Sequence, residues 1–230
     1  MSTYHQIGHH SKNLIFEPNL SNFQGAILSP VNYSQSEIVE LIGKVRDEFD
    51  KFDIVFDPQL YYPHSDREIL KHWSYFPKDF ETVDLTDLKW WHKLVSEISK
   101  TISEINPNTI CTPVIHPRAF NIDYYSLMNN ISCDLCDSLL NTDVRVLQTA
   151  LISLSDLADF NQVMKIASIL TRTTADGIYL IFYSNSNPRR ELHDPEELKG
   201  GMLLINTLQN NNIDVLVGYS SSEIILWKES

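Results

Sequence analysis

The sequence predicts an α/β fold in which parallel strands lie side by side and helices cover them. Three observations predict it. Short apolar runs alternate with amphipathic runs, the resulting units recur roughly every 30 to 37 residues, and no low-complexity linker interrupts them. Such alternation is typical of a parallel sheet. We expect a single α/β domain over residues 1–230, with an N-terminal extension over 1–23 and an aromatic-rich insertion over 61–92.

The first half of the chain contains three strand-helix units. Ser34 and Glu37 form a capping-box pattern, which predicts the start of the first helix. Pro113 cannot donate to a strand ladder, so its strand is expected to bulge or to end early. The strands are predicted at 25–31, 52–56 and 109–115, and the helices at about 34–49, 87–105 and 121–140.

The second half repeats the pattern three more times. Asp194 followed by Pro195 predicts a helix start, because aspartate caps the first turn and proline fits its first position. The run 177–183 is the clearest buried strand in the chain. The strands are predicted at 144–151, 177–183 and 213–217, and the helices at about 155–171, from 194 and from 223.

Composition excludes several classes of protein. The formal charge is 18 − 30 = −12, which disfavours nonspecific binding to nucleic acid. With 43% hydrophobic residues the chain is too apolar to be disordered, yet no run reaches the roughly 18 apolar residues of a membrane helix. The N-terminus shows no apolar signal segment. We expect no membrane association.

Cysteine usage favours the cytoplasm. Three cysteines, an odd number, fit a reducing compartment. Cys133 and Cys136 form a lone C-x-x-C within a predicted helix, where a redox pair would not be placed. Since no second such pair exists, we expect no metal site, and the sequence leaves the cofactor unknown.

Two architectures fit the alternation. An open doubly wound sheet that binds nucleotides is disfavoured, because no glycine-rich turn follows the first strand and no P-loop is present. A TIM-barrel-like fold is favoured, because polar or aromatic groups follow nearly every strand and would meet at one mouth. Only about six of the usual eight units are recognised, so the barrel is expected to be incomplete. A protein partner or a second copy would cover its open edge, unless the chain is a shortened relative or the sheet is open by design.

Three segments, ILSPVNY, FDPQLYYP and GYSSSEIILWK, resemble parts of tRNA-guanine-transglycosylase-like and related TIM-barrel enzymes. The resemblance lies in the layout of the units across about residues 25 to 227. The glycine-rich substrate motif and the zinc-binding cysteines of that family are absent from the sequence. The resemblance therefore implies a barrel and assigns no catalytic residue.

Candidate site residues follow the predicted strands. Asp57 is expected to act as general base or nucleophile beside apolar walls, and its alternative role is to start a turn. His116 and Arg118 are expected to bind or polarise a phosphate, a carboxylate or a developing oxyanion. The alternative is that both residues only form part of a structural loop. The expected substrate-binding residues are Asn32, Tyr33, Gln59, Gln148, Tyr183 and Tyr219, the tyrosines by stacking on a ring.

Two functions remain open. The first is an enzyme, a transferase or hydrolase, that acts on a small polar or ring-bearing substrate of nucleoside or sugar type. The second is a non-catalytic subunit whose incomplete barrel docks on a partner, with the acidic surface and the aromatic insertion providing recognition. The polar strand ends favour the first function, and the low number of units favours the second.

Overall fold

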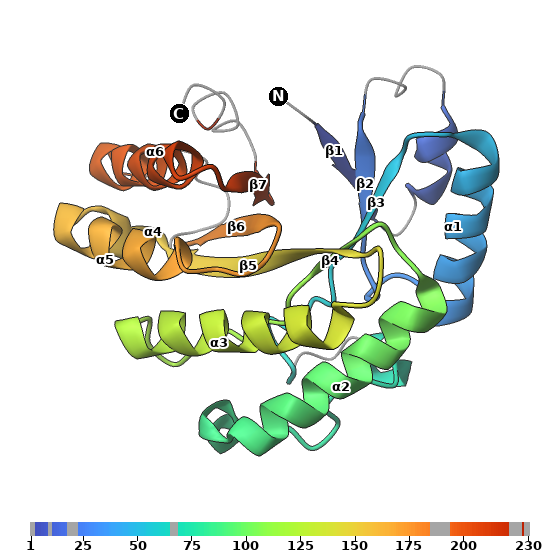
Figure 1. Cartoon of the computed structure of the whole chain (residues 1–230), viewed down its shortest axis with the longest axis horizontal. Helices are drawn as coiled ribbons and strands as arrows, with labels where there is room; N and C mark the ends of the chain where they lie inside the picture. Colours follow the sequence, from blue (N-terminus) through green and yellow to red (C-terminus); the bar gives the residue numbers. More distant parts are fainter. Residues whose placement is uncertain are drawn as a thin grey trace. The chain divides into compact units, whose positions relative to one another are not determined.

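A computed structural model of the chain describes residues 3–8, 11–17, 23–64, 69–184, 194–220 and 227. The chain divides into two compact units. Unit 1 comprises residues 1–115 and 134–146, and unit 2 comprises 116–133 and 147–230. Both contain parallel strands with helices along them (Figure 1). The predicted α/β fold of TIM-barrel type is confirmed, whereas the single-domain boundaries stay a prediction.

Unit 1 contains four parallel strands in sequence order, β1 to β4. The one strand that the sequence did not predict is β1, which lies in the N-terminal extension and pairs with β2. Pro113 has the expected effect, because β4 ends before it. The elements are β1 (Tyr4–Gln6), η1 (Lys12–Phe16), β2 (Gly25–Leu28), α1 (Gln35–Glu48), β3 (Asp53–Phe56), η3 (Leu70–His72), η4 (Thr82–Thr86), α2 (Leu88–Ile105) and β4 (Thr109–Cys111).

Unit 2 contains three parallel strands, β5 to β7. Where the sequence predicts one helix over 155–171, the structure has two, α4 and α5. Helix α3 ends in unit 1, and strand β5 begins there. The predicted helix from residue 223 lies outside the described residues, apart from Trp227. The elements are α3 (Ile122–Leu139), β5 (Arg145–Ser153), α4 (Leu154–Leu157), α5 (Phe160–Leu170), β6 (Gly177–Tyr183), α6 (Pro195–Asn210) and β7 (Asp214–Gly218).

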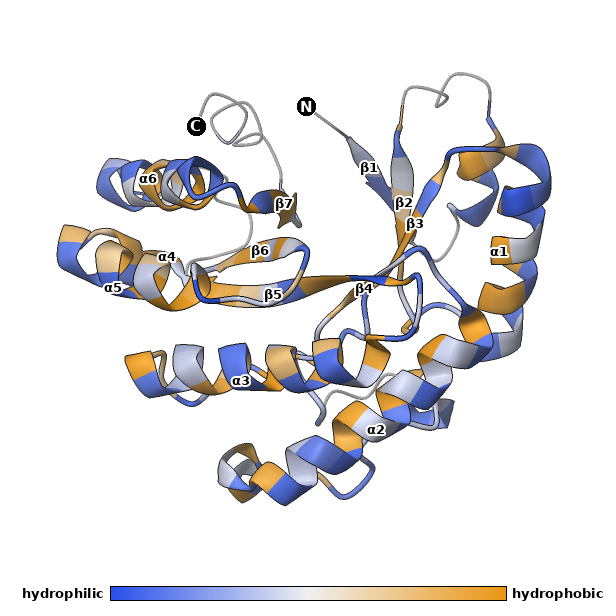
Figure 2. Cartoon of the chain, in the orientation of Figure 1, coloured by the Kyte–Doolittle hydropathy of each residue, from blue (hydrophilic) through white to orange (hydrophobic). Residues whose placement is uncertain are grey.

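The core follows the amphipathic pattern of the helices. The buried residues of α2, which include Trp91, Ile98 and Ile102, recur at helical spacing. Figure 2 shows apolar and polar residues alternating around this helix. Asn106, at φ 49°, ends α2 in the left-handed conformation that asparagine tolerates. Among the residues that the structure describes, no helix combines the length and apolar character that a membrane crossing requires.

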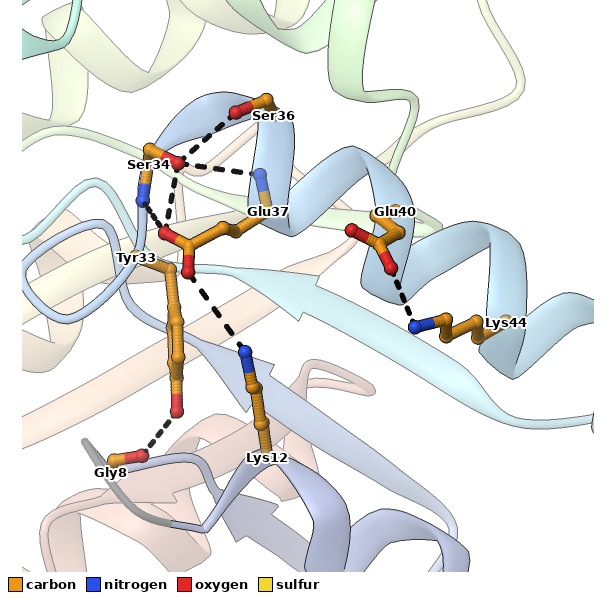
Figure 3. A network of polar contacts seen from close by, with 8 residues as sticks. All are labelled: Gly8, Lys12, Tyr33, Ser34, Ser36, Glu37, Glu40 and Lys44. Atoms are coloured by element: carbon orange, nitrogen blue, oxygen red, sulfur yellow. Dashed lines mark hydrogen bonds and ion pairs between the residues drawn. The ribbon is translucent and has the colours of Figure 1, made fainter.

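The start of α1 is fixed by the predicted capping box (Figure 3). The Oγ of Ser34 accepts from the Glu37 backbone, and the Glu37 carboxylate accepts from the Ser34 backbone N–H at 2.9 Å. Lys12 lies 3.9 Å from the same carboxylate. The N-terminal segment therefore lies beside the first turn of α1.

The aromatic insertion packs onto unit 1 through Trp73. This side chain is 2% exposed, and its Nε1–H donates to the carbonyls of Pro30 and Tyr33, each at 3.1 Å. Its ring contacts those of Phe56 and Tyr75 at centroid distances of 5.3 and 5.6 Å. The insertion is thereby anchored to the segment that follows β2 and to Phe56, the last residue of β3.

Candidate functional site

Asp57 lies directly after β3, where the sequence placed it. Residues alternate in direction along a strand, so Asp53, Val55 and Asp57 project from the same face of β3. Asp57 is only 1% exposed, and its backbone N–H continues the ladder by donating to the Leu28 carbonyl at 3.1 Å. The strand thus holds this carboxylate at its carboxyl end, the end at which barrel enzymes place their active sites.

Two donors converge on the Asp57 carboxylate. The Tyr61 hydroxyl donates to Oδ2 at 2.7 Å, and the Gln59 backbone N–H donates to Oδ1 at 3.0 Å. Gln59 has a φ of 51°, a conformation that costs free energy for a residue with a side chain. Its Oε1 accepts from the Ser29 hydroxyl at 2.5 Å. Donors thus hold both oxygens of the carboxylate in a fixed position at the end of β3.

The negative charge of Asp57 acts on two buried neighbours. Burial raises the pKa of Tyr75 well above its ordinary value, and Asp57 raises it further. Burial likewise raises the pKa of the Cys111 thiol, with a second contribution from Asp57. Tyr75 donates its hydroxyl to the Pro58 carbonyl at 3.2 Å. Both groups are therefore neutral at pH 7, and Cys111 is not a reactive thiolate.

Two of the predicted site residues, Asn32 and Tyr33, lie between β2 and α1 and occupy different environments. Asn32 is half-buried, and its backbone N–H donates to the Ser29 carbonyl. Tyr33 is 3% exposed, and its hydroxyl donates to the Gly8 carbonyl at 2.6 Å (Figure 3). Stacking of Tyr33 on a ligand would require this contact to open.

His116 belongs to unit 2 and lies in a cluster of aromatic rings. Its ring is 4.3 Å from that of Tyr183 and 5.2 Å from that of Phe120, in both cases edge to face. Burial lowers the pKa of His116, while a hydrogen bond involving the backbone of Pro117 opposes this shift. The imidazole is therefore neutral at pH 7. The structure thus places two predicted site residues, His116 and Tyr183, in direct contact.

The remaining predicted residues of unit 2 are dispersed. Arg118 is exposed, and Tyr219 is 50% exposed with a φ of 54°. Gln148 lies within β5 rather than after it, because it pairs with Ile178 in the ladder. It shares a sheet face with Phe182, whose ring contacts Trp227 at 4.8 Å and lies near α6. Gln148 therefore points toward the helical layer, fully buried, and its amide meets no hydrogen-bonding group of the described residues.

Asp156 is a strand-end carboxylate that the sequence reasoning missed. Its position beside Ser155 was interpreted as the start of a helix, and it does lie in α4. It also follows β5 by three residues, and its Oδ2 accepts from the Tyr125 hydroxyl at 3.1 Å. Burial raises the pKa of Asp156, and the hydrogen bond from Tyr125 opposes the shift. An acidic residue within five positions of the end of a predicted strand was the available signal.

The raised pKa of Asp156 makes the stability of the protein pH-dependent in a defined direction. The native carboxyl binds its proton more tightly than the unfolded chain does. Its contribution is complete below the ordinary pKa of aspartate and is lost as the pH rises through the raised value. We expect Asp156→Asn to gain stability relative to the wild type between about pH 4 and pH 7. Urea unfolding at a series of pH values measures this difference, and a constant difference across the series would contradict the assignment.

A groove of about 520 Å³, lined mainly by polar side chains, lies between α2 and the C-terminal part of α3, both of which belong to unit 1 there. His92 Nδ1 is 3.1 Å from the Asp134 carboxylate there, and Ser99 and Ser138 share a hydrogen bond at 2.8 Å. These side chains come from the middle of α2 and from the last turns of α3, not from strand ends. Within the described ranges, no three His, Cys, Asp or Glu side chains gather as a metal-binding group.

The comparisons with known proteins agree with this architecture. No protein-family model matches the chain, and no curated protein is significantly similar to it in sequence. A GH18 chitinase from Pseudoalteromonas aurantia superposes with a TM-score of 0.51 at 12% identity, over 94% of this chain and 79% of the chitinase. Catalytic domain 2 of the group II chitinase of Ostrinia furnacalis gives 0.50 at 8% identity, over 94% of this chain and 63% of that one. The spore cortex-lytic enzyme SleL of Bacillus megaterium gives 0.50 at 12% identity, over 94% and 48%. At such low identity these likenesses show the fold alone: this chain has the α/β architecture of TIM-barrel proteins.

Proposed function

We propose that this protein is an enzyme that acts on a sugar- or nucleoside-type substrate, with Asp57 as its general base or nucleophile. The observation that carries the proposal is the environment of the Asp57 carboxylate. It is buried at the carboxyl end of β3 and receives two hydrogen bonds, from the Tyr61 hydroxyl and the Gln59 backbone. The strained φ of Gln59 directs that N–H at the carboxylate.

The environment of Asp57 supports this role over that of a simple turn cap. A cap requires only the bond from the Gln59 backbone, which closes the turn after β3. Tyr61 adds a second donor to the other carboxylate oxygen, and apolar and aromatic groups exclude water around it. A water-excluded carboxylate with fixed donors is preorganised to remove a proton or to attack an electrophilic carbon.

The chitinase and cortex-lytic neighbours guide the choice of substrates to test. We would assay the full chain with 4-nitrophenyl glycosides, a chito-oligosaccharide and nucleosides, and measure release of nitrophenol, shorter sugars or free base. Asp57→Asn is expected to reduce kcat/KM at least about 100-fold, because an amide is neither base nor nucleophile. Turnover by Asp57→Asn at the wild-type rate would disprove the role of Asp57.

Asp53 offers a matched control on the same strand. It lies on the same face as Asp57 but at the opposite end of β3, and it also accepts from a tyrosine hydroxyl, that of Tyr4, at 2.8 Å. Thr109 donates to its other oxygen at 3.1 Å. Asp53→Asn is expected to lower stability slightly and to leave kcat/KM unchanged. Equal losses of activity in both variants would indicate a structural role for both carboxylates.

The alternative function, a non-catalytic subunit, rests on β7. Val215, Leu216 and Val217 of β7 are half-exposed, whereas their partners in β6 are buried. Partly exposed apolar residues on a strand favour docking of another chain. Native mass spectrometry of the purified protein decides this point: a monomer at micromolar concentration that turns over substrate would reject the subunit function.

A further inference from the structure

Three side chains of unit 2 form a continuous aromatic surface near strand ends. Tyr183 is the last residue of β6, and Phe120 lies just before α3. Their rings are 5.7 Å apart and tilted by 32°. The ring of His116 stands edge-on to both, at 4.3 Å from Tyr183 and 5.2 Å from Phe120. The three contacting rings, each half-exposed, thereby form one aromatic surface.

This surface differs from a closed aromatic core in its exposure. Phe120, Tyr183 and His116 are all half-exposed, whereas Tyr124 and Tyr125, which support Phe120, are 7% and 3% exposed. The ring of Tyr125 is 6.3 Å from that of Phe120 and nearly parallel to it, at 29°. Buried rings therefore hold the exposed ones in place.

A carboxylate is connected to this surface through Tyr125. The Tyr125 hydroxyl donates to the half-buried Asp156 carboxylate at 3.1 Å, so the residue that supports Phe120 also orients a carboxylate. The Nε2 of His116 is buried, so this ring packs against Tyr183 and Phe120 rather than presenting a polar atom to a ligand. Aromatic rings near a hydroxyl-binding carboxylate are the combination that polar, ring-shaped ligands require.

We propose that Phe120 and Tyr183 bind one face of a neutral sugar ring, with Asp156 as a hydrogen-bonding group for its hydroxyls and His116 as the ring that holds Tyr183 and Phe120 in place. This site lies wholly within unit 2 and is proposed in addition to the role of Asp57 in unit 1. The geometry favours a ligand on one side of the rings. A nucleobase inserted between two aromatic rings needs about 7 Å between the rings. The rings of Phe120 and Tyr183 are only 5.7 Å apart, so no nucleobase fits between them.

The charge of the protein favours an uncharged ligand. The chain carries a formal charge of −12, and Asp156 adds a carboxylate beside the rings, so phosphorylated sugars and nucleotides would be repelled. A pyranose presents an apolar face of C–H groups and a rim of hydroxyls, which matches half-exposed aromatic rings with a carboxylate nearby.

The test measures binding and turnover separately on the full chain. Saturation-transfer-difference NMR and calorimetry with a chito-oligosaccharide, methyl glucoside and adenosine would be run on the wild type, Phe120→Ala and Tyr183→Ala. Each alanine variant is expected to weaken sugar binding about fivefold to tenfold. Phe160→Ala is the matched control, since Phe160 is a 62% exposed ring of unit 2 for which the structure shows no aromatic contact among described residues. It should bind as the wild type does.

The outcomes separate this inference from the proposed function. Sugar binding that persists in both alanine variants, binding of adenosine in preference to the sugars, or no sugar binding at all would overturn the inference. Sugar binding that both variants lose, in a protein without Asp57-dependent turnover, would support this site and contradict the enzymatic proposal. If Asp57→Asn abolished turnover while the alanine variants of Phe120 and Tyr183 bound sugar normally, the enzymatic proposal would be supported and this binding site contradicted.

Discussion

Replacing Gly200 with alanine is expected to destabilise the protein by about 3 kcal/mol or more. Gly200 lies in α6 at its contact with α4. A β-carbon at this position would lie only 1.9 Å from the backbone oxygen of Leu157 and 2.7 Å from its backbone carbon. A rotamer change cannot relieve an overlap with backbone, so α4 and α6 would have to separate. Urea unfolding of Gly200→Ala monitored by circular dichroism measures the loss.

Gly43→Ala is the control for the same substitution. Gly43 is an exposed position within α1, and apart from the neighbouring backbone of its own helix no atom lies within 4 Å of where its β-carbon would be. Alanine has a higher helix propensity than glycine, so this variant should gain about 0.5–1 kcal/mol. If Gly200→Ala were as stable as the wild type, the close approach of α4 and α6 would be wrong.

Trp73→Ala is expected to cost about 3–5 kcal/mol. The side chain is nearly fully buried, contacts the rings of Phe56 and Tyr75, and bonds the carbonyls of Pro30 and Tyr33. The alanine variant loses both the packing and the donor. The insertion should then detach from the segment after β2 and from the end of β3, which hydrogen exchange of residues 69–80 would reveal as faster exchange.

Trp73→Phe separates the two contributions. It keeps most of the ring packing but removes Nε1–H, which leaves two buried carbonyls without this donor, at a cost of about 1–3 kcal/mol. Trp90→Phe is the comparison, because Trp90 is half-exposed and its ring contacts Phe80 and Trp91. An alanine variant at position 73 with wild-type stability would show that the insertion does not depend on this residue.

Local sequence signals predicted most elements of the fold because they act within a few residues. The capping box of Ser34 and Glu37, the early strand end before Pro113 and the Asp194-Pro195 helix start all appear in the structure. Strand β1 was missed because its three residues, Tyr-His-Gln, carry no apolar alternation. Its position depends on pairing with β2, which no local pattern specifies.

The candidate site was less accessible to sequence reasoning, because it depends on contacts between distant residues. The placement of Asp57 after β3 followed from the strand pattern, but its hydroxyl donor depends on how the insertion folds back. Gln148 shows how register decides direction: its place in the β5–β6 ladder turns it toward the helices. Asp156 and Phe120 were overlooked because only the tertiary structure brings Tyr125 between them.

The short strand β1 has a consequence for the behaviour of the protein in solution. β2, with the sequence Gly-Ala-Ile-Leu, is buried throughout, and β1 pairs along it with three half-buried, hydrogen-bonding side chains. Because β1 covers it, the aliphatic strand β2 is not the edge strand of its sheet, where it could pair with other molecules. If residues up to Phe23 were deleted, β2 would become an exposed edge strand. We expect the truncated protein to self-associate and to form insoluble material during purification.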